Sequence, residues 1–195
     1  MTSATAAAPV RFGLAAILLA SLAAFFVVGR ADGAGRAWTS YLAPASACRG
    51  STDPAASPSV QRRAIGCLIN WARVQERRAR LAQPASLQRA AALKGRGVAS
   101  CGQFSHTPCG ADPAASLRAA GYRYSSFGEN LFVGPWGQVT ARQVVASWLQ
   151  SPPHRANVLR PGFRDVGAAF VRAHDLFGDG EGDTVVWIAA FAAPR

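Results

Sequence analysis

The sequence predicts an α+β domain, a three-layer α–β–α sandwich, preceded by an N-terminal hydrophobic helix and a linker. Three observations lead to this prediction. Apolar residues recur at helical spacing in four segments between residues 59 and 151. After residue 160 the pattern changes to short runs rich in valine and aromatic residues, as in strands. Half of the 195 residues are hydrophobic, which is enough for the core of one domain.

The first thirty residues predict export. Residues 12–29 form an uncharged apolar run between Arg11 and Arg30. As a helix this run would rise about 27 Å, close to the roughly 30 Å of a bilayer core. We therefore expect residues 1–30 to be either a signal peptide or a membrane anchor, with any membrane contact through residues 12–29.

A linker and the folded domain are expected to follow. Residues 31–58 are rich in Ala, Gly, Ser and Pro, a composition typical of a linker. The compact domain is expected over residues 59–195.

Cap and turn residues delimit the predicted helices. Ser59 and Thr140 are favourable N-caps, and Asp112 followed by Pro113 is a strong helix start. Pro152 is expected to end the last helix. The helices are predicted at residues 59–80, 84–98, 112–121 and 140–151.

Three strands complete the prediction. Their expected ranges are residues 122–133, 163–171 and 184–191. The polar, glycine-rich segment 174–183 between the last two is typical of a hairpin loop. Its acidic residues do not have the spacing of a twelve-residue calcium loop.

Four cysteines are consistent with an oxidising compartment. Their even number predicts two disulfides, for which three pairings are possible. We favour Cys48–Cys67 and Cys101–Cys109 because the members of each pair are close in sequence.

The chain is strongly basic, with a formal charge of +11 and an estimated pI of about 11.1. Almost all of this charge comes from arginine, because Lys94 is the only lysine. Such a surface attracts polyanions. No nucleic-acid-binding fingerprint is present, so nucleic acid is not an expected partner. For an exported chain, an anionic cell-wall polymer, a glycan or a lipid fits better.

Three polar residues are candidates for a functional site. His106 lies in the segment between Cys101 and Gly110, and Glu129 and His154 lie in the stretch 128–155. Two imidazoles and a carboxylate can hold zinc or another divalent cation, or can transfer protons. They can equally form a hydrogen-bonded network without chemistry. The sequence leaves these alternatives open.

Several short motifs resemble the CAP (SCP-like) domain of the cysteine-rich secretory, antigen 5 and pathogenesis-related proteins, in particular its bacterial branch. The resemblance spans about residues 59–193 and depends on the order and spacing of its pieces. They are Asn70-Trp71-Ala72-Arg73, Phe104-Ser105-His106, Gly128-Glu129-Asn130, Trp148-Leu149-Gln150-Ser151, Pro153-His154-Arg155 and the final run from Trp187 to Phe191.

The resemblance implies an α–β–α sandwich with a cleft lined by two histidines and two acidic residues. Carried over by motif, three of these positions are His106, Glu129 and His154. The fourth falls near Ser151, where this chain has no acidic residue, so a mechanism that needs two carboxylates is in doubt. We also expect Trp136, in the loop after the Gly-Glu-Asn motif, to lie at the rim of the cleft, and Arg155 to neutralise Glu129.

These observations predict an exported, membrane-tethered or secreted binding module of the cell envelope. The second hypothesis is a metal-dependent hydrolase that uses His106, Glu129 and His154, with zinc as the first metal to test. The sequence does not decide whether the protein is an enzyme.

Overall fold

A computed structural model describes residues 37–180 and 182–195. The predicted hydrophobic helix at residues 12–29 lies outside these residues. Within the described part, no helix is long and apolar enough to span a bilayer.

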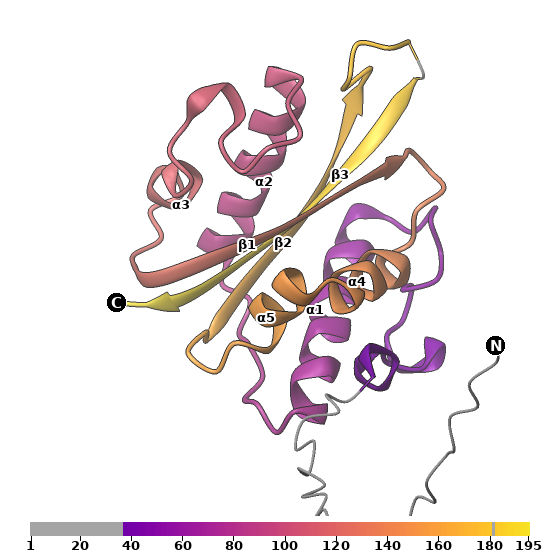
Figure 1. Cartoon of the computed structure of the whole chain (residues 1–195), viewed down its shortest axis with the longest axis vertical. Coiled ribbons are helices and arrows are strands. Elements are labelled where there is room, and N and C mark those ends of the chain that lie inside the picture. The colour runs from indigo at the N-terminus through magenta and orange to yellow at the C-terminus, as the bar shows by residue number, and fades with distance from the viewer. Residues whose placement is uncertain (1–36, 181) are drawn as a thin grey trace, which may run out of the picture. The chain divides into compact units, whose positions relative to one another are not determined.

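Figure 1 shows the arrangement of the elements. In chain order they are η1 (Trp38–Tyr41), η2 (Ala45–Ala47), α1 (Pro58–Gln75), α2 (Ala85–Cys101), η3 (Pro108–Gly110), α3 (Ala115–Ala119), β1 (Tyr124–Pro135), α4 (Ala141–Gln150), α5 (Pro152–Leu159), β2 (Asp165–His174) and β3 (Asp183–Pro194).

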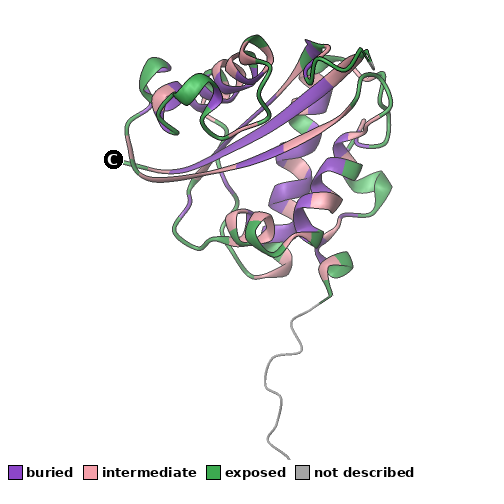
Figure 2. Cartoon of the chain, turned by 45° about the horizontal axis from the view of Figure 1, so that its top comes forward, coloured by how far each residue is buried: buried purple, intermediate pink, exposed green. Residues whose placement is uncertain are grey.

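The three strands form one antiparallel sheet in the order β1-β3-β2. Helices α1, α4 and α5 cover one face, and α2 and α3 cover the other (Figure 1). Central strand β3 is buried on both faces because its side chains alternate between two cores. Trp187 and Phe191 belong to the core beneath α1 and α4, whereas Val186 and Ile188 belong to the core beneath α2. Figure 2 shows this burial along the strand.

Two glycines let α2 lie close to the sheet. A Cβ on Gly167 would come within 2.1 Å of the Leu87 carbonyl oxygen, and one on Gly95 within 2.6 Å of Ile188. Any larger residue at Gly167 would meet backbone atoms, which cannot turn aside as a side chain can. The lack of a side chain at these positions thus sets the distance between α2, which carries Lys94, and the strands.

The predicted helices and strands are confirmed in place, but several of their ends differ and one further helix, α5, is present. Helix α1 ends at Gln75 rather than near residue 80, because Arg77 has a φ of 52° and turns the chain back. Helix α3 is a single short turn rather than the whole of residues 112–121. The proline pair that ends α4 also begins α5, since proline is well tolerated in a first helical turn.

The predicted linker is wrong for residues 37–58. Tyr41, Ala43 and Cys48 are buried in the core beside α1 and α4. Tyr41 donates a hydrogen bond to Glu76, and the Cys48–Cys67 disulfide fixes the segment to α1. Although its composition is typical of a linker, this segment is therefore part of the folded domain and packs on α1 and α4.

Arg73 ties α1 to the segment that follows α5. It is fully buried and donates hydrogen bonds to the carbonyl oxygens of Ala79, Val158, Arg160 and Phe163. Burial, followed by the charges of neighbouring arginines, lowers the pKa of Arg73 to about 10. The guanidinium is still charged at neutral pH and is satisfied by backbone dipoles rather than by a carboxylate.

Candidate functional site

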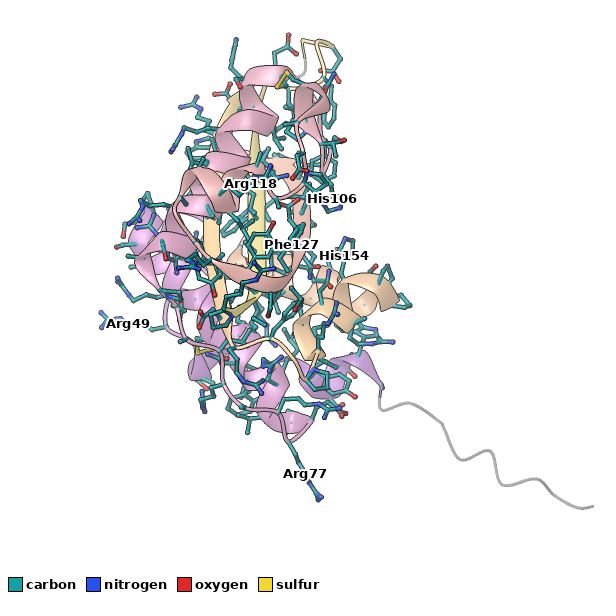
Figure 3. The ribbon with its side chains drawn as sticks, turned by 90° about the vertical axis from the view of Figure 1, so that its left-hand side faces the viewer. Arg49, Arg77, His106, Arg118, Phe127 and His154 are labelled. Atoms are coloured by element: carbon teal, nitrogen blue, oxygen red, sulfur yellow. A yellow bond between two sulfur atoms is a disulfide. The ribbon has the colours of Figure 1, made fainter. Side chains whose placement is uncertain are left out.

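The predicted site residues gather at the β1 edge of the sheet. We name Lys94, His106, Glu129, Ser151 and His154 the β1-edge cluster. Glu129 lies in β1, Lys94 in α2, and His106 in the loop between Cys101 and Cys109. Ser151 and His154 come from the start of α5, on the other face of the sheet. Figure 3 shows His106 and His154 on the same side of the molecule.

His106 and Glu129 form a direct pair. The His106 Nδ1 to Glu129 Oε1 distance is 2.7 Å, and the Glu129 side chain is 8% exposed whereas that of His106 is 56% exposed. An ionised carboxylate can only accept, so Nδ1 carries the proton in this hydrogen bond. In the neutral imidazole, Nε2 then has a free lone pair, as in many metal-binding and general-base histidines.

Lys94 occupies the other carboxylate oxygen. Its Nζ lies 3.5 Å from Glu129 Oε2, and its side chain is 4% exposed. The ammonium also donates to the carbonyl oxygens of His106, at 2.6 Å, and Pro113, at 3.3 Å. Lys94 therefore neutralises Glu129 and holds the backbone of the loop that carries His106.

The expectation that Arg155 neutralises Glu129 is wrong. Arg155 Nη1 donates to the carbonyl oxygen of Leu149, 2.9 Å away, which closes the end of α4. Sequence reasoning did not assign Lys94 to the site. One feature of the sequence could have pointed to Lys94: it is the only lysine in a chain whose other Lys or Arg positions are all arginine.

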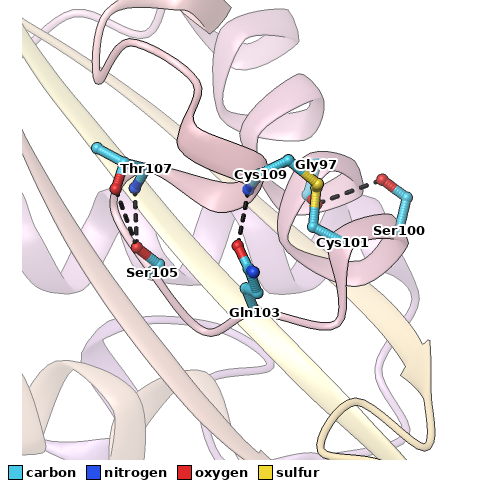
Figure 4. The surroundings of a disulfide bond; sticks show 7 residues. All are labelled: Gly97, Ser100, Cys101, Gln103, Ser105, Thr107 and Cys109. Carbon is cyan, nitrogen blue, oxygen red and sulfur yellow. Dashed lines mark hydrogen bonds between the residues drawn. A yellow bond between two sulfur atoms is a disulfide. The ribbon is translucent and has the colours of Figure 1, made fainter.

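A disulfide and two side chains fix the loop of His106 (Figure 4). The Cys101–Cys109 bond joins the end of α2 to η3. Gln103 Oε1 accepts a hydrogen bond from the Cys109 amide at 2.7 Å, and Ser105 Oγ accepts one from the Thr107 amide at 3.0 Å. These short-range contacts position an imidazole that is itself exposed. Both predicted disulfides are formed.

The Gly-Glu-Asn motif holds α5 against β1. Asn130 is fully buried and its Nδ2 donates to the His154 carbonyl oxygen at 3.0 Å. Asn157 Nδ2 donates to Asn130 Oδ1 at 2.9 Å and to the Glu129 carbonyl oxygen at 3.2 Å. A Cβ on Gly128 would lie 2.8 Å from Asn157 Oδ1, so glycine permits this approach. Asn130 and Asn157 are structural parts of the site that the sequence left without a role.

His154 is held by its own helix. Its Nδ1 lies 2.9 Å from Ser151 Oγ, the residue that precedes α5. A hydroxyl can donate or accept, so this bond suits either tautomer. Burial, followed by the charge of His106, lowers the pKa of His154 below its usual 6.5, so His154 is neutral at pH 7.

The described residues do not show the expected three-ligand metal site. Among the described residues, no group of three or more His, Cys, Asp and Glu side chains is placed to hold a metal ion. The physical reason is that Glu129 is already shared between the His106 ring and the Lys94 ammonium. A cation bound by that carboxylate would have to displace Lys94 or lie beside its charge. Glu129 instead orients His106.

Trp136 does not lie with the β1-edge cluster. It follows the end of β1, seven residues after Glu129, which in an extended strand separates the two by roughly 20 Å. The Trp136 ring lies 6.2 Å from that of Phe170, and the Arg172 guanidinium lies 5.2 Å from its centroid. Trp136 therefore lines a different part of the surface.

The comparison with protein families supports the resemblance noted in the motifs. The model of the cysteine-rich secretory protein family, CAP, matches residues 68–191, well over half of the chain. The chain belongs to this family. The match contains His106, Glu129 and His154 as well as most of the sheet and all the helices from α2 to α5.

Bacterial relatives share the CAP domain. The chain is 28% identical over 142 residues to the uncharacterized protein YkwD of Bacillus subtilis, covering 71% of this chain and 54% of that protein. It thus spans about half the length of this curated relative.

Solved structures show the same fold. An extracellular SCP-domain protein of Bacillus anthracis matches with a TM-score of 0.57 and 18% identity, over 69% of this chain and 41% of that one. An outer surface protein of Borrelia burgdorferi has a TM-score of 0.57 and 17% identity, over 67% and 90%. A cysteine-rich secretory protein of Staphylococcus aureus has a TM-score of 0.55 and 16% identity, over 72% and 40%.

Proposed function

We propose that this CAP domain is an extracytoplasmic binding module of the cell envelope, and that the β1-edge cluster is its binding site. The observation that carries the proposal is the pairing of both Nδ1 atoms within the protein, to Glu129 and to Ser151. Among the described residues, neither His106 Nε2 nor His154 Nε2 has a hydrogen-bond partner. His106 Nε2 is then an acceptor, and His154 Nε2 accepts or donates according to its tautomer, so the two ring nitrogens are suited to hydroxyl groups, which can both donate and accept.

The location and the class of ligand rest on separate observations. Two disulfides are typical of an oxidising compartment, and named relatives are extracellular or outer surface proteins. Hydroxyl-rich wall polymers supply hydrogen-bond donors, and the excess of arginine would attract their anionic groups at longer range. Membrane tethering through residues 12–29 remains part of the proposal.

Co-sedimentation with purified cell-wall sacculi tests the proposal. We expect His106→Ala/His154→Ala to weaken binding roughly tenfold, since two ligand hydrogen bonds are lost. The matched control is His174→Ala, which removes the third histidine. His174 is 89% exposed and pairs with Asp183 on the β2–β3 hairpin. Equal binding by the wild type and both variants would contradict the proposal.

The hydrolase hypothesis has one favourable observation and two against it. Glu129 orients His106 as a general base would require. However, the described residues do not supply a third metal ligand, and the Ser151–His154 pair has no carboxylate that orients its histidine. Zinc that binds in a one-to-one ratio, and is lost on mutation of either histidine, would favour the enzyme.

A further inference from the structure

A hollow of about 340 Å³ lies on the α1 and α4 side of the sheet, beyond the end of β1. The segment before α1, the first turns of α1, the loop after β1 and the strands β2 and β3 line it. Its volume is at the lower end of the range of about 300–1,000 Å³ that is usual for ligand pockets. It contains none of the residues of the β1-edge cluster.

Aromatic rings form one wall of the hollow. Phe170 and Trp187 stack with ring centroids 4.8 Å apart, and Trp136 continues the row at 6.2 Å from Phe170. Trp136 is 39% exposed, which is unusual for the largest side chain in a domain with a complete core. An exposed tryptophan at the mouth of a pocket provides a flat surface for a ligand.

Two residues that line the hollow each carry a buried polar atom without a partner. Among the described residues, three buried side-chain polar atoms have no hydrogen bond, namely Ser51 Oγ, Gln61 Oε1 and Trp187 Nε1. The last two belong to residues that line the hollow. Both residues are at most 2% exposed. Buried polar groups are nearly always paired, so two unpaired ones in one place point to a missing partner.

The amide orientation of Gln61 follows from its surroundings. Gln61 Nε2 lies 2.8 Å from the Asp53 carbonyl oxygen, which can only accept a hydrogen bond. The nitrogen must therefore face Asp53, and the unpaired atom is the acceptor Oε1. The indole Nε1 of Trp187 can only donate. Gln61 Oε1 therefore needs a donor and Trp187 Nε1 needs an acceptor.

We propose that this hollow is a second ligand site and that it binds a neutral pyranose sugar. A sugar hydroxyl donates and accepts at once, and the C–H face of a pyranose ring can stack on an aromatic ring such as Trp136. No charged side chain is among the described residues that line the hollow. Arg172, whose guanidinium lies 5.2 Å from the Trp136 ring centroid, is outside this lining, so a carboxylate or phosphate deeper in the hollow, near Gln61 and Trp187, would be desolvated without a counter-charge. An alkyl chain would leave Gln61 and Trp187 unpaired.

The test uses the full chain labelled with ¹⁵N at tryptophan. Methyl β-D-glucopyranoside and N-acetyl-D-glucosamine are titrated while the five indole N–H signals are followed by NMR. We expect the signals of Trp136 and Trp187 to shift and those of the other tryptophans to stay. Trp136→Ala should weaken binding roughly tenfold, and Gln61→Met roughly threefold to tenfold.

Matched controls distinguish sugar binding in this hollow from sugar binding elsewhere on the surface. Trp71→Phe changes a tryptophan outside the hollow and should leave the affinity unchanged. Sorbitol carries hydroxyls without a rigid ring face and should not shift the indoles. Because Trp136 is exposed, its variant is expected to fold, and retained dispersion of the other indole signals would verify this.

The proposal is overturned if neither sugar shifts the Trp136 and Trp187 signals, if sorbitol shifts them equally, or if Trp136→Ala binds as well as the wild type. It is also overturned if decanoate gives these shifts and the sugars do not. The inference goes beyond the proposed function and fails separately from it. His106→Ala/His154→Ala should still bind the sugar here, even if it no longer sediments with sacculi.

Discussion

Replacing Lys94 with methionine leaves a buried carboxylate without its counter-charge. Methionine matches the length and shape of the lysine stem, so the change removes the ammonium with little loss of volume. Glu129, 8% exposed, would then keep only the His106 ring as a partner. The carbonyl oxygens of His106 and Pro113 would also lose their donor.

The expected cost follows from the burial of both partners. Removing one member of a buried ion pair costs about 3–5 kcal/mol, because the charge that remains is uncompensated. For a domain of this size, each kcal/mol shifts Tm by about 2–4 °C. Lys94→Met should therefore lower Tm by roughly 6–20 °C. An exposed ion pair would contribute no more than about 1 kcal/mol.

Urea unfolding followed by far-ultraviolet circular dichroism measures the effect. Arg96→Met is the matched control, since Arg96 lies in the same helix but is exposed, and it should cost little. Lys94→Met/Glu129→Gln should be destabilised by less than the sum of the single variants, because no unpaired charge is buried. A loss below about 1 kcal/mol for Lys94→Met would refute the role given to this lysine.

Three further predictions concern buried or constrained groups. Arg73→Met should cost about 3–5 kcal/mol in urea unfolding, because four backbone carbonyls lose their donor; a loss similar to that of Arg96→Met would contradict this. Cys101→Ser/Cys109→Ser should lower stability by about 2–3 kcal/mol and broaden the NMR signals of His106, and sharp, unshifted signals would show that the disulfide does not order the loop. Burial and the charge of His106 lower the pKa of His154, so the unfolded chain binds this proton more tightly than the folded chain does. As the pH decreases below about 6.5, the wild type should therefore lose stability relative to His154→Gln. Parallel curves of Tm against pH for the two proteins would exclude that linkage.

The sheet and most helices could be predicted because their signals are local. Thr140 caps α4 in a capping box with Gln143, and both residues are visible in the sequence. The alternation of Val185, Val186, Trp187 and Ile188 in β3 reflects burial on two faces. The linker prediction was wrong because composition alone does not show that Tyr41 and Ala43 pack on the domain. Their burial depends on α1 and α4, which are distant in sequence.

The sequence was sufficient to predict most of the residues that belong to the site, but not which side chains they contact. Motif spacing identified His106, Glu129 and His154, but nothing near Glu129 in sequence points to Lys94, which is 35 positions earlier, in helix α2. The same limit applies to Trp136. Its distance in sequence from Glu129 is short, but an extended strand converts seven residues into a wide spatial separation. Arg155 was expected to neutralise Glu129 as a nearby charge in the motif region, although the arginine side chain closes α4 instead.

The tautomers of His106 and His154 test the central claim most directly. Long-range ¹⁵N–¹H NMR correlations of the imidazole rings distinguish a protonated Nδ1 from a protonated Nε2, and should be recorded at about pH 8, where ordinary histidines are neutral. We predict that neutral His106 carries its proton on Nδ1 and leaves Nε2 free, because Glu129 Oε1 lies 2.7 Å from Nδ1. A proton on Nε2 of His106 would contradict the pairing with Glu129 on which the proposed binding site depends.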